Sequence, residues 1–161
     1  NLGKLINQTV KAHQDQARLR NITLNVQLEE DIDIVVDASA FSIILSNFVT
    51  NALKHSPSNS EILIKNDLED DFLTTLSVID HGKGIPKKYR DRVFERFFRV
   101  DKGRAKHSGG TGLGLAISKH LARLMGYEVG MKPNKPNGSR FWISVNYASS
   151  GEKKSLTPEL A

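Results

Sequence analysis

One run of alternating glycines limits the possible fold and function of this chain more than any other feature. The run is Gly109-Gly110-Thr111-Gly112-Leu113-Gly114-Leu115, and it stands at the start of an apolar helical pattern. Three alternating glycines lower helix propensity and add no packing. Glycine does let a backbone approach a ligand closely, and the N–H groups at the start of a helix bind anions. A second glycine turn, Asp80-His81-Gly82-Lys83-Gly84, comes earlier in the chain. Together the two turns predict a nucleotide site.

Two common nucleotide motifs do not fit the glycine run. The dinucleotide fingerprint would need a third glycine where Leu115 stands, and no Gly-Lys-Ser or Gly-Lys-Thr triplet follows, as a Walker loop requires. The residues instead predict a helix start at which Thr111 caps the helix or donates to a phosphate.

A helix expected from Asp37 to Ser56 carries a polar face beside its apolar stripe. Asn47, Asn51, Lys54 and His55 share this face at spacings of i, i+4, i+7 and i+8. Alone, such a face is more typical of the solvated side of an amphipathic helix. Carboxamide oxygens also suit Mg²⁺, and a lysine can neutralise phosphate. Beside two glycine turns, the face predicts a metal and phosphate site.

Asp80 ends an apolar row, since Leu76, Val78 and Asp80 point the same way in a strand. A buried carboxylate needs a partner, and the exocyclic amine of adenine is a suitable donor. Gly82 and Gly84 remove side chains where a flat base would lie. The alternative from the residues alone is a plain turn that Asp80 caps.

Helical and alternating patterns are mixed along the chain without regular βαβ order. We expect a helix from Leu2 towards Arg20 with no clear N-cap, a helix capped by Asp37 or Ser39, a short helix after Pro86, and a helix ended by Gly126. Strands are expected at 22–28, 32–36, 61–66, 72–80, 129–131 and 140–145. This predicts an α/β fold, a two-layer sandwich with a mixed, mostly antiparallel sheet covered on one face by helices.

Charge and composition exclude some functions. Zero cysteines exclude disulfides and thiolate chemistry, and no stretch has the apolar length of a bilayer span. The net charge of +5 arises largely from a basic stretch between the glycine turns, 87–106. Such a cluster suits a nucleotide triphosphate as well as a nucleic acid backbone. Because Asn1 is not a natural start, we expect a piece of a longer chain.

Between the glycine turns, the segment Phe94-Glu95-Arg96-Phe97-Phe98-Arg99 alternates aromatic and charged residues. We expect Phe94 and Phe97 to anchor it in the core. Arg99, at the root of the stretch that follows, is better placed than Arg96 to reach a terminal phosphate, an expectation that rests partly on the family resemblance described below. The polar stretch 101–110 that follows is interpreted as a mobile loop.

These motifs resemble those of bacterial sensor histidine kinases. The segment Asn47–His55 resembles the N box, Asp80–Gly84 the G1 box, Phe94–Arg99 the F box and Gly110–Gly114 the G2 box, in the family's order and spacing. The resemblance implies the Bergerat ATP-binding fold of the GHKL superfamily, with an ATP lid between the F and G2 boxes. It covers the chain up to about residue 145, and it divides it into a hairpin remnant or exit (1–20), an ATP-binding domain (21–148) and a disordered tail (149–161).

The resemblance also implies roles for individual residues. Asn51, assisted by Asn47, would hold Mg²⁺, and Lys54 and Arg99 would contact the phosphates. Asp80 would select adenine, beside Gly82, Gly84 and Ile85. The backbone from Gly112 to Leu115 would cradle the phosphates, next to Gly110 and Thr111. His55 stands where the family often has tyrosine. From these metal and phosphate roles, the resemblance implies that Asn47, Lys54 and Arg99 take part in catalysis, with ATP and Mg²⁺ as cofactors.

Asn47 discriminates within the superfamily. The related gyrase, mismatch-repair and heat-shock ATPases have a glutamate at this position that activates water, and an asparagine cannot act as a general base. The resemblance therefore implies phosphoryl transfer to a histidine rather than hydrolysis. No His-Glu or His-Asp pair occurs, since His13 precedes Gln14 and His120 precedes Leu121. We expect this chain to bind ATP without autophosphorylating.

The implied partners are a phosphoacceptor histidine on a dimerisation domain and a response regulator, with no nucleic acid. The whole protein would be a homodimer and this piece a monomer, on the cytoplasmic side of a membrane-anchored sensor. Three alternatives stay open: a free-standing ATPase, a serine kinase of the anti-sigma type, and a basic nucleic-acid-binding module.

Overall fold

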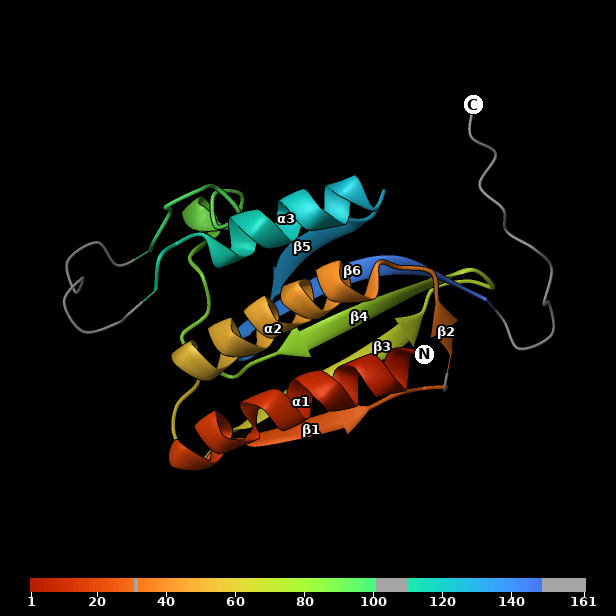
Figure 1. Cartoon of the computed structure of the whole chain (residues 1–161). Helices are drawn as coiled ribbons and strands as arrows, with labels where there is room; N and C mark the ends of the chain where they lie inside the picture. The colour runs from red at the N-terminus through yellow and green to blue at the C-terminus, as the bar shows by residue number, and fades with distance from the viewer. Residues whose placement is uncertain (31, 101–109, 149–161) are drawn as a thin grey trace.

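The computed structural model describes residues 1–30, 32–100 and 110–148 (Figure 1). The described helices are α1 (Leu2–Leu19), α2 (Ala38–His55), the short 3₁₀ helix η1 (Lys87–Tyr89) and α3 (Gly114–Leu124). The strands are β1 (Thr23–Gln27), β2 (Asp33–Ile34), β3 (Glu61–Leu68), β4 (Leu73–Ile79), β5 (Glu128–Pro133) and β6 (Ser139–Ala148). The order of helices and strands follows the sequence prediction. The expected loop and tail, at 101–109 and 149–161, lie outside the described residues.

The strands form one mixed sheet in the order β1-β3-β4-β6-β2, and β5 also pairs with β6. β1 runs parallel to β3, with Thr23 opposite Glu61. The remaining pairs are antiparallel, including the long pairing of β4 with β6. The prediction of a mixed, mostly antiparallel sheet is confirmed.

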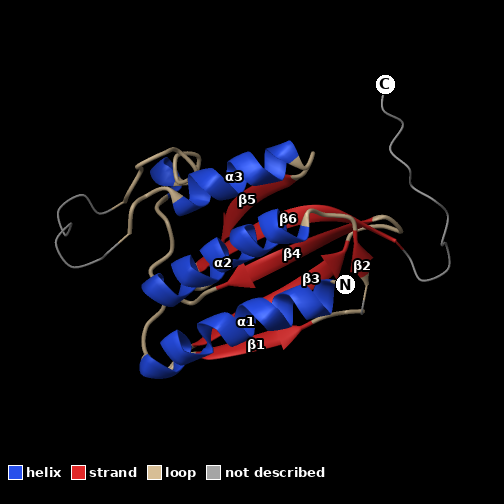
Figure 2. Cartoon of the chain, viewed as in Figure 1, coloured by secondary structure: helices blue, strands red, loops and turns tan. Residues whose placement is uncertain are grey.

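The three α-helices cover one face of this sheet (Figure 2). Phe48 of α2 packs against Phe141 of β6 with ring centroids 5.7 Å apart, and this pair joins the two layers. Burial of a large apolar side chain contributes about 1.5–3 kcal/mol. The fully buried large side chains are Leu2, Ile6, Phe41, Ile44, Leu45, Phe48, Leu53, Ile62, Ile64, Leu76, Phe141 and Ile143. The predicted two-layer sandwich is therefore confirmed.

Both long helices begin at a capping side chain. The Asp37 carboxylate accepts a hydrogen bond from the Ala40 N–H at 2.8 Å, so Asp37 rather than Ser39 caps α2. Asn1 caps α1 in the same way, accepting from the Lys4 N–H at 3.0 Å. The expectation that α1 has no clear N-cap was therefore wrong. α1 also supplies Leu2 and Ile6 to the core. Its origin as the exit of an upstream hairpin stays a prediction.

α3 packs against α2 with a different face from the one its apolar pattern predicts. Ser118 and Ala122 are buried, whereas Ile117 and Leu124 are 44% and 70% exposed. Small side chains permit the close approach of α3 to α2. Leu115 and Leu121 still pack against the core, and only Ile117 and Leu124 of the larger apolar residues in α3 face outward.

Among the aromatic residues before the loop, Phe98 rather than Phe97 packs inward. Phe98 lies 5.7 Å from the Tyr89 ring, while Phe97 is 71% exposed. The Phe97 backbone has a positive φ of 61°, and its N–H donates to the Gly112 carbonyl at 2.9 Å. Phe94 is half-buried beside Phe141. Within the described residues, no helix is both long and apolar enough to cross a bilayer.

Candidate functional site

The polar face of α2 meets the first turn of α3 at Asn47. The Asn47 side-chain amide donates to the Gly114 carbonyl at 2.9 Å and to the Ser118 hydroxyl at 3.1 Å. Ser118 donates to the same Gly114 carbonyl at 2.9 Å. A Cβ at position 114 would lie 3.3 Å from Asn47 Oδ1, so glycine allows this approach. The Asn47 nitrogen is therefore committed to α3, and its oxygen is the atom available to a ligand.

Asn51, Lys54 and His55 follow Asn47 along α2. Asn51 and Lys54 are half-buried, and His55 is exposed. Burial lowers the pKa of the Lys54 ammonium, and the positive charge of Arg99 lowers it further. Lys54 and Arg99, which are far apart in the sequence, thus lie close enough to repel. An anion placed between them would relieve this repulsion.

Asp80, directly after β4, is the buried acid of this region. Its side chain is nearly inaccessible, at 2% exposed. Oδ1 accepts hydrogen bonds from the Gly82 N–H at 2.8 Å and the Ser139 N–H at 3.2 Å. Burial raises the pKa of Asp80, and these two N–H donors and the nearby His81 oppose part of the rise. Because both bonds within the described residues fall on Oδ1, Oδ2 is available to a donor on a ligand.

Gly82 brings the loop after Asp80 against the end of α2. A Cβ at position 82 would lie 2.4 Å from the His55 carbonyl oxygen, so no side chain fits there. Gly84 has a φ of 72° and lies against Gly138. Ile85 packs against the core, and its carbonyl accepts from Arg90 at 2.9 Å. The loop that follows the buried acid is therefore fixed on both sides.

The turn between β5 and β6 supports this loop, and sequence reasoning missed it. Asn134 donates to the Asp80 carbonyl at 3.0 Å, and the Asp80 N–H donates to the Ser139 carbonyl at 2.9 Å. Gly138 has a φ of 121° and lies directly against Asp80. The one available signal was the glycine and proline turn at 133–138, which marks a turn but not its neighbour. Ser118 was also missed, since a serine inside a helix gives no signal of its own.

The glycine run 110–114 contacts the backbone at Phe97 and leads into α3. The Phe97 N–H donates to the Gly112 carbonyl at 2.9 Å, and Gly112 has a φ of 71°. A Cβ there would lie 3.0 Å from the Phe97 backbone. The Leu113 N–H donates to the Thr111 hydroxyl at 3.3 Å. Leu113, not Thr111, is the N-cap residue of α3, which corrects the predicted cap.

Leu115 is half-buried against the core, and Gly110 is the first described residue after the loop. The first turn of α3 lies next to Asn47, because the Asn47 side chain binds the Gly114 carbonyl. Helix N-terminal N–H groups attract anions. The run therefore places the start of α3, with its first-turn N–H groups, beside the polar face of α2.

Some cations of the basic stretch make contacts within the fold. Arg90 bonds the Ile85 carbonyl, and Arg92 pairs with Glu95 while lying 4.6 Å from the centre of the Phe98 ring. Lys88 lies 4.8 Å from the centre of the Tyr89 ring. These contacts give Lys88, Arg90 and Arg92 partners within the described part of the chain.

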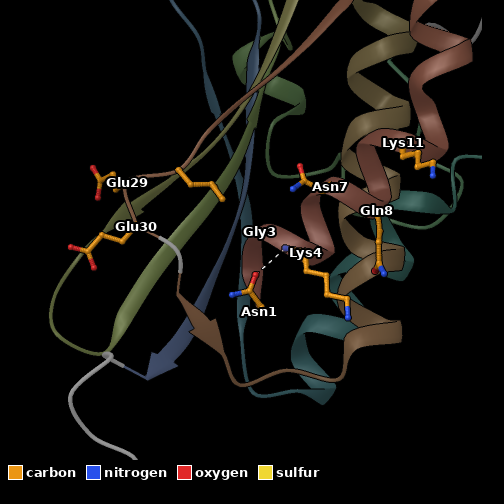
Figure 3. Close-up of a pocket in the computed structure, with 9 residues that line it drawn as sticks. Asn1, Gly3, Lys4, Asn7, Gln8, Lys11, Glu29 and Glu30 are labelled. Atoms are coloured by element: carbon orange, nitrogen blue, oxygen red, sulfur yellow. Dashed lines mark hydrogen bonds between the residues drawn. The ribbon is translucent and has the colours of Figure 1, made fainter.

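A hollow of about 780 Å³ lies elsewhere, between α1 and the segment after β1 (Figure 3). Glu29 and Glu30 lie on one side of it, and Lys4 and Lys11 project from α1 on the other. None of the predicted site residues lines it. It is a shallow surface between an exposed helix face and a connection.

The described residues contain no group of three or more histidine, cysteine, aspartate or glutamate side chains suited to a metal ion. A divalent cation at this site would instead need carboxamide oxygens, with Asn47 and Asn51 nearest, together with oxygens of a bound ligand. Mg²⁺ accepts this arrangement, since it keeps several waters and takes few protein ligands.

Residues 36–149 match the family model described as histidine kinase-, DNA gyrase B-, and HSP90-like ATPase. The sensor histidine kinase WalK of Bacillus subtilis is 36% identical over 125 residues, which are 77% of this chain and 20% of WalK. The chain thus spans about a fifth of the length of this curated relative.

Solved structures share the fold. The mycobacterial sensor histidine kinase MprB matches with a TM-score of 0.78 and 26% identity, over 91% of this chain and 95% of the MprB chain. Full-length ShkA in complex with AMPPNP matches with a TM-score of 0.80 and 28% identity, over 93% of this chain and 31% of the ShkA chain.

Proposed function

The chain belongs to the histidine kinase-, DNA gyrase B- and HSP90-like ATPase family, and from this membership we propose that it is the ATP-binding catalytic domain of a sensor histidine kinase. It binds ATP with Mg²⁺ and presents the γ-phosphoryl group to a histidine on a dimerisation domain. The likeness to WalK and MprB, both sensor histidine kinases, supports this assignment within the family.

The arrangement of Asp80 carries the proposal. Oδ1 is held by two backbone N–H groups, so Oδ2 faces the ligand as an acceptor with a fixed direction. The exocyclic amine of adenine donates to such an acceptor, whereas guanine presents a carbonyl oxygen at the equivalent position. Gly82 lets the loop beside the acid pack against the His55 carbonyl, which fixes this loop next to Asp80. ShkA, which shares this fold, is in complex with AMPPNP, an analogue of ATP.

Lys54, Arg99 and the start of α3 form the phosphate end of the proposed site. Lys54 and Arg99 repel each other, and phosphate oxygens between them would convert this repulsion into two attractions. The backbone N–H groups from Gly112 to Leu115 cradle the remaining oxygens. Asn51 and Asn47 hold Mg²⁺ through their carboxamide oxygens. The ion supplies neutralisation of the phosphate charge as it develops in transfer.

Asn47 directs the chemistry towards transfer. Its nitrogen is committed to Gly114 and Ser118, and a carboxamide has no lone pair basic enough to remove a proton from water. Hydrolysis is therefore slow. The residues of this chain act by holding ATP in position and by stabilising charge, and the acceptor histidine comes from elsewhere.

We assign the domain bounds to 21–148, with α1 before it as the connection to the phosphoacceptor hairpin. The whole protein would act as a homodimer that passes the phosphoryl group to a response regulator, and this domain alone would be a monomer. A membrane-anchored sensor with this domain on its cytoplasmic side fits the same proposal. Because a nucleotide triphosphate suits the basic charge of this region, we propose no nucleic-acid partner.

A transfer assay tests this proposal. The domain is mixed with γ-labelled ATP, Mg²⁺ and a separately expressed phosphoacceptor hairpin from the same protein. We expect acid-labile label on the hairpin, none on the domain, and little free phosphate without the hairpin. Rapid release of phosphate by the domain alone would indicate an ATPase instead, and label on a serine would indicate a serine kinase.

A further inference from the structure

The end of α2 leaves its last carbonyls without helical donors, and the Leu53 carbonyl is one of them. In a continuing helix the N–H of residue 57 would donate to the Leu53 carbonyl, but Pro57 has no N–H. Arg20, at the end of α1, supplies this donor. Its guanidinium donates to the Leu53 carbonyl through Nη1 and to the Ser56 carbonyl through Nη2, the latter at 2.9 Å. A cation at this position also meets the negative end of the α2 dipole.

The backbone at Arg20 is itself fixed by the way α1 ends. Asn21 has a φ of 53°, its N–H donates to the Arg18 carbonyl at 3.0 Å, and the Ile22 N–H donates to the Ala17 carbonyl at 2.9 Å. This is a Schellman ending, and its buried apolar contact is formed by Ala17 and Ile22. Arg20 therefore extends to α2 from a rigid base.

The segment that Arg20 holds carries groups of both halves of the proposed nucleotide site. Lys54 lies between the two carbonyls that Arg20 binds and interacts with Arg99. The His55 carbonyl, also between them, lies against Gly82 in the loop that follows Asp80. A displacement of residues 53–56 would move the phosphate-binding cation and the support of the base-binding loop together.

We propose that Arg20 is a positioning residue of the nucleotide site, a role that rests on the proposed function. Arg20 touches no ligand. It fixes the end of α2, and this places Lys54 and the Asp80–Gly84 loop at the positions that ATP binding requires. The position of α1 is thereby coupled to the site.

The test compares ATP affinity among variants of Arg20, measured by displacement of the fluorescent analogue TNP-ATP. Arg20→Met keeps the length of the side chain and removes its donors, and we expect about tenfold weaker binding, the size of one charge-assisted hydrogen bond. Arg20→Lys keeps the cation but lacks the fork that reaches both carbonyls, so a smaller loss of about threefold is expected. Arg18→Met is the matched control, since Arg18 lies on the exposed side of α1 and pairs only weakly with Asp15 at 3.9 Å.

A double-mutant cycle with Lys54→Met distinguishes positioning from a general loss of stability. If Arg20 acts through Lys54, the double variant loses less affinity than the sum of the two single losses. Additive losses, or wild-type affinity in Arg20→Met, would overturn the proposal. If Arg20→Met does not fold, unchanged affinity in Arg20→Lys overturns it equally. Failure of the wild-type chain to bind ATP would instead refute the proposed function.

Discussion

Gly138 and Asp80 are packed so closely that no side chain fits between them: a Cβ at position 138 would lie 1.9 Å from the Asp80 carbonyl oxygen. Asn134 donates to that same carbonyl from the same turn. The turn between β5 and β6 therefore fixes the backbone of the acid that we propose recognises adenine. Its contribution is to position the acid, since neither Gly138 nor Asn134 is part of the predicted ligand set.

Gly138→Ala should destabilise the domain and weaken ATP binding together. The collision with Asp80 adds to the strain of a positive φ, so we expect a loss of at least about 3 kcal/mol in the free energy of unfolding. Gly126→Ala is the control, because Gly126 also has a positive φ but nothing within 4 Å of its added Cβ. That variant should lose about 1 kcal/mol and keep its ATP affinity. Equal losses in urea unfolding would contradict the packing argument.

Asp80→Asn should keep the fold and abolish ATP binding. The asparagine oxygen can still accept from the Gly82 and Ser139 N–H groups, which leaves an NH₂ group facing the adenine amine. The NH₂ group of the asparagine and the amine of adenine are both donors, so they cannot form a hydrogen bond. Fluorescence titration with TNP-ATP measures the loss, and Asp71→Asn removes the same charge from an exposed position as a control. Unchanged affinity in Asp80→Asn would rule out the role of this acid in base recognition.

The stability of the domain should carry a pH dependence that originates at Asp80. Burial raises the pKa of Asp80 above its ordinary value of 3.8, so the folded state holds this proton more tightly than the unfolded state does. The contribution of Asp80 to the free energy of unfolding therefore falls as the pH rises from about 3.8 through the folded-state pKa. The free energy of unfolding of the Asp80→Asn variant lacks this pH-dependent contribution, because asparagine does not titrate. The stability of the variant relative to wild type should thus increase across that interval, and a constant difference would contradict the assignment.

Features that depend on a periodic pattern within one helix or strand could be predicted from the sequence. The apolar stripe and the polar face of α2 follow from helical spacing, which acts over a few residues, while the residue types at its start narrowed the cap to Asp37 or Ser39. Asp80 was likewise found from the alternation of β4. The order of helices and strands was then sufficient for the two-layer fold.

Contacts between distant segments could not be predicted in this way. The support of Asp80 by Gly138 depends on the register of β6 against β4, which no local pattern encodes. Phe97 and Phe98 are neighbours of the same type, and only the contacts of Phe98 with Tyr89 and Arg92 show which of the two packs inward. Arg20 gave no signal, because its partners, the Leu53 and Ser56 carbonyls, lie at the end of another helix.

Asn51→Ala should remove the dependence of ATP binding on Mg²⁺. Asn51 is half-buried on the polar face of α2, and we propose that its oxygen holds the ion. Isothermal titration with and without Mg²⁺ measures the dependence. Thr50→Ala, at an exposed neighbouring position on α2, should leave it intact. A full Mg²⁺ dependence retained in Asn51→Ala would place the ion elsewhere.

The central claim is that this chain holds an adenine nucleotide between Asp80 and the start of α3. Titration of the wild-type chain with ATP, ADP and GTP, each with and without Mg²⁺, tests it most directly. The account predicts that ATP and ADP bind, that Mg²⁺ strengthens the binding of ATP, and that GTP binds at least about a hundredfold more weakly, since the Asp80 acceptor would face a carbonyl oxygen. Equal affinity for ATP and GTP, or no binding of either, would contradict it.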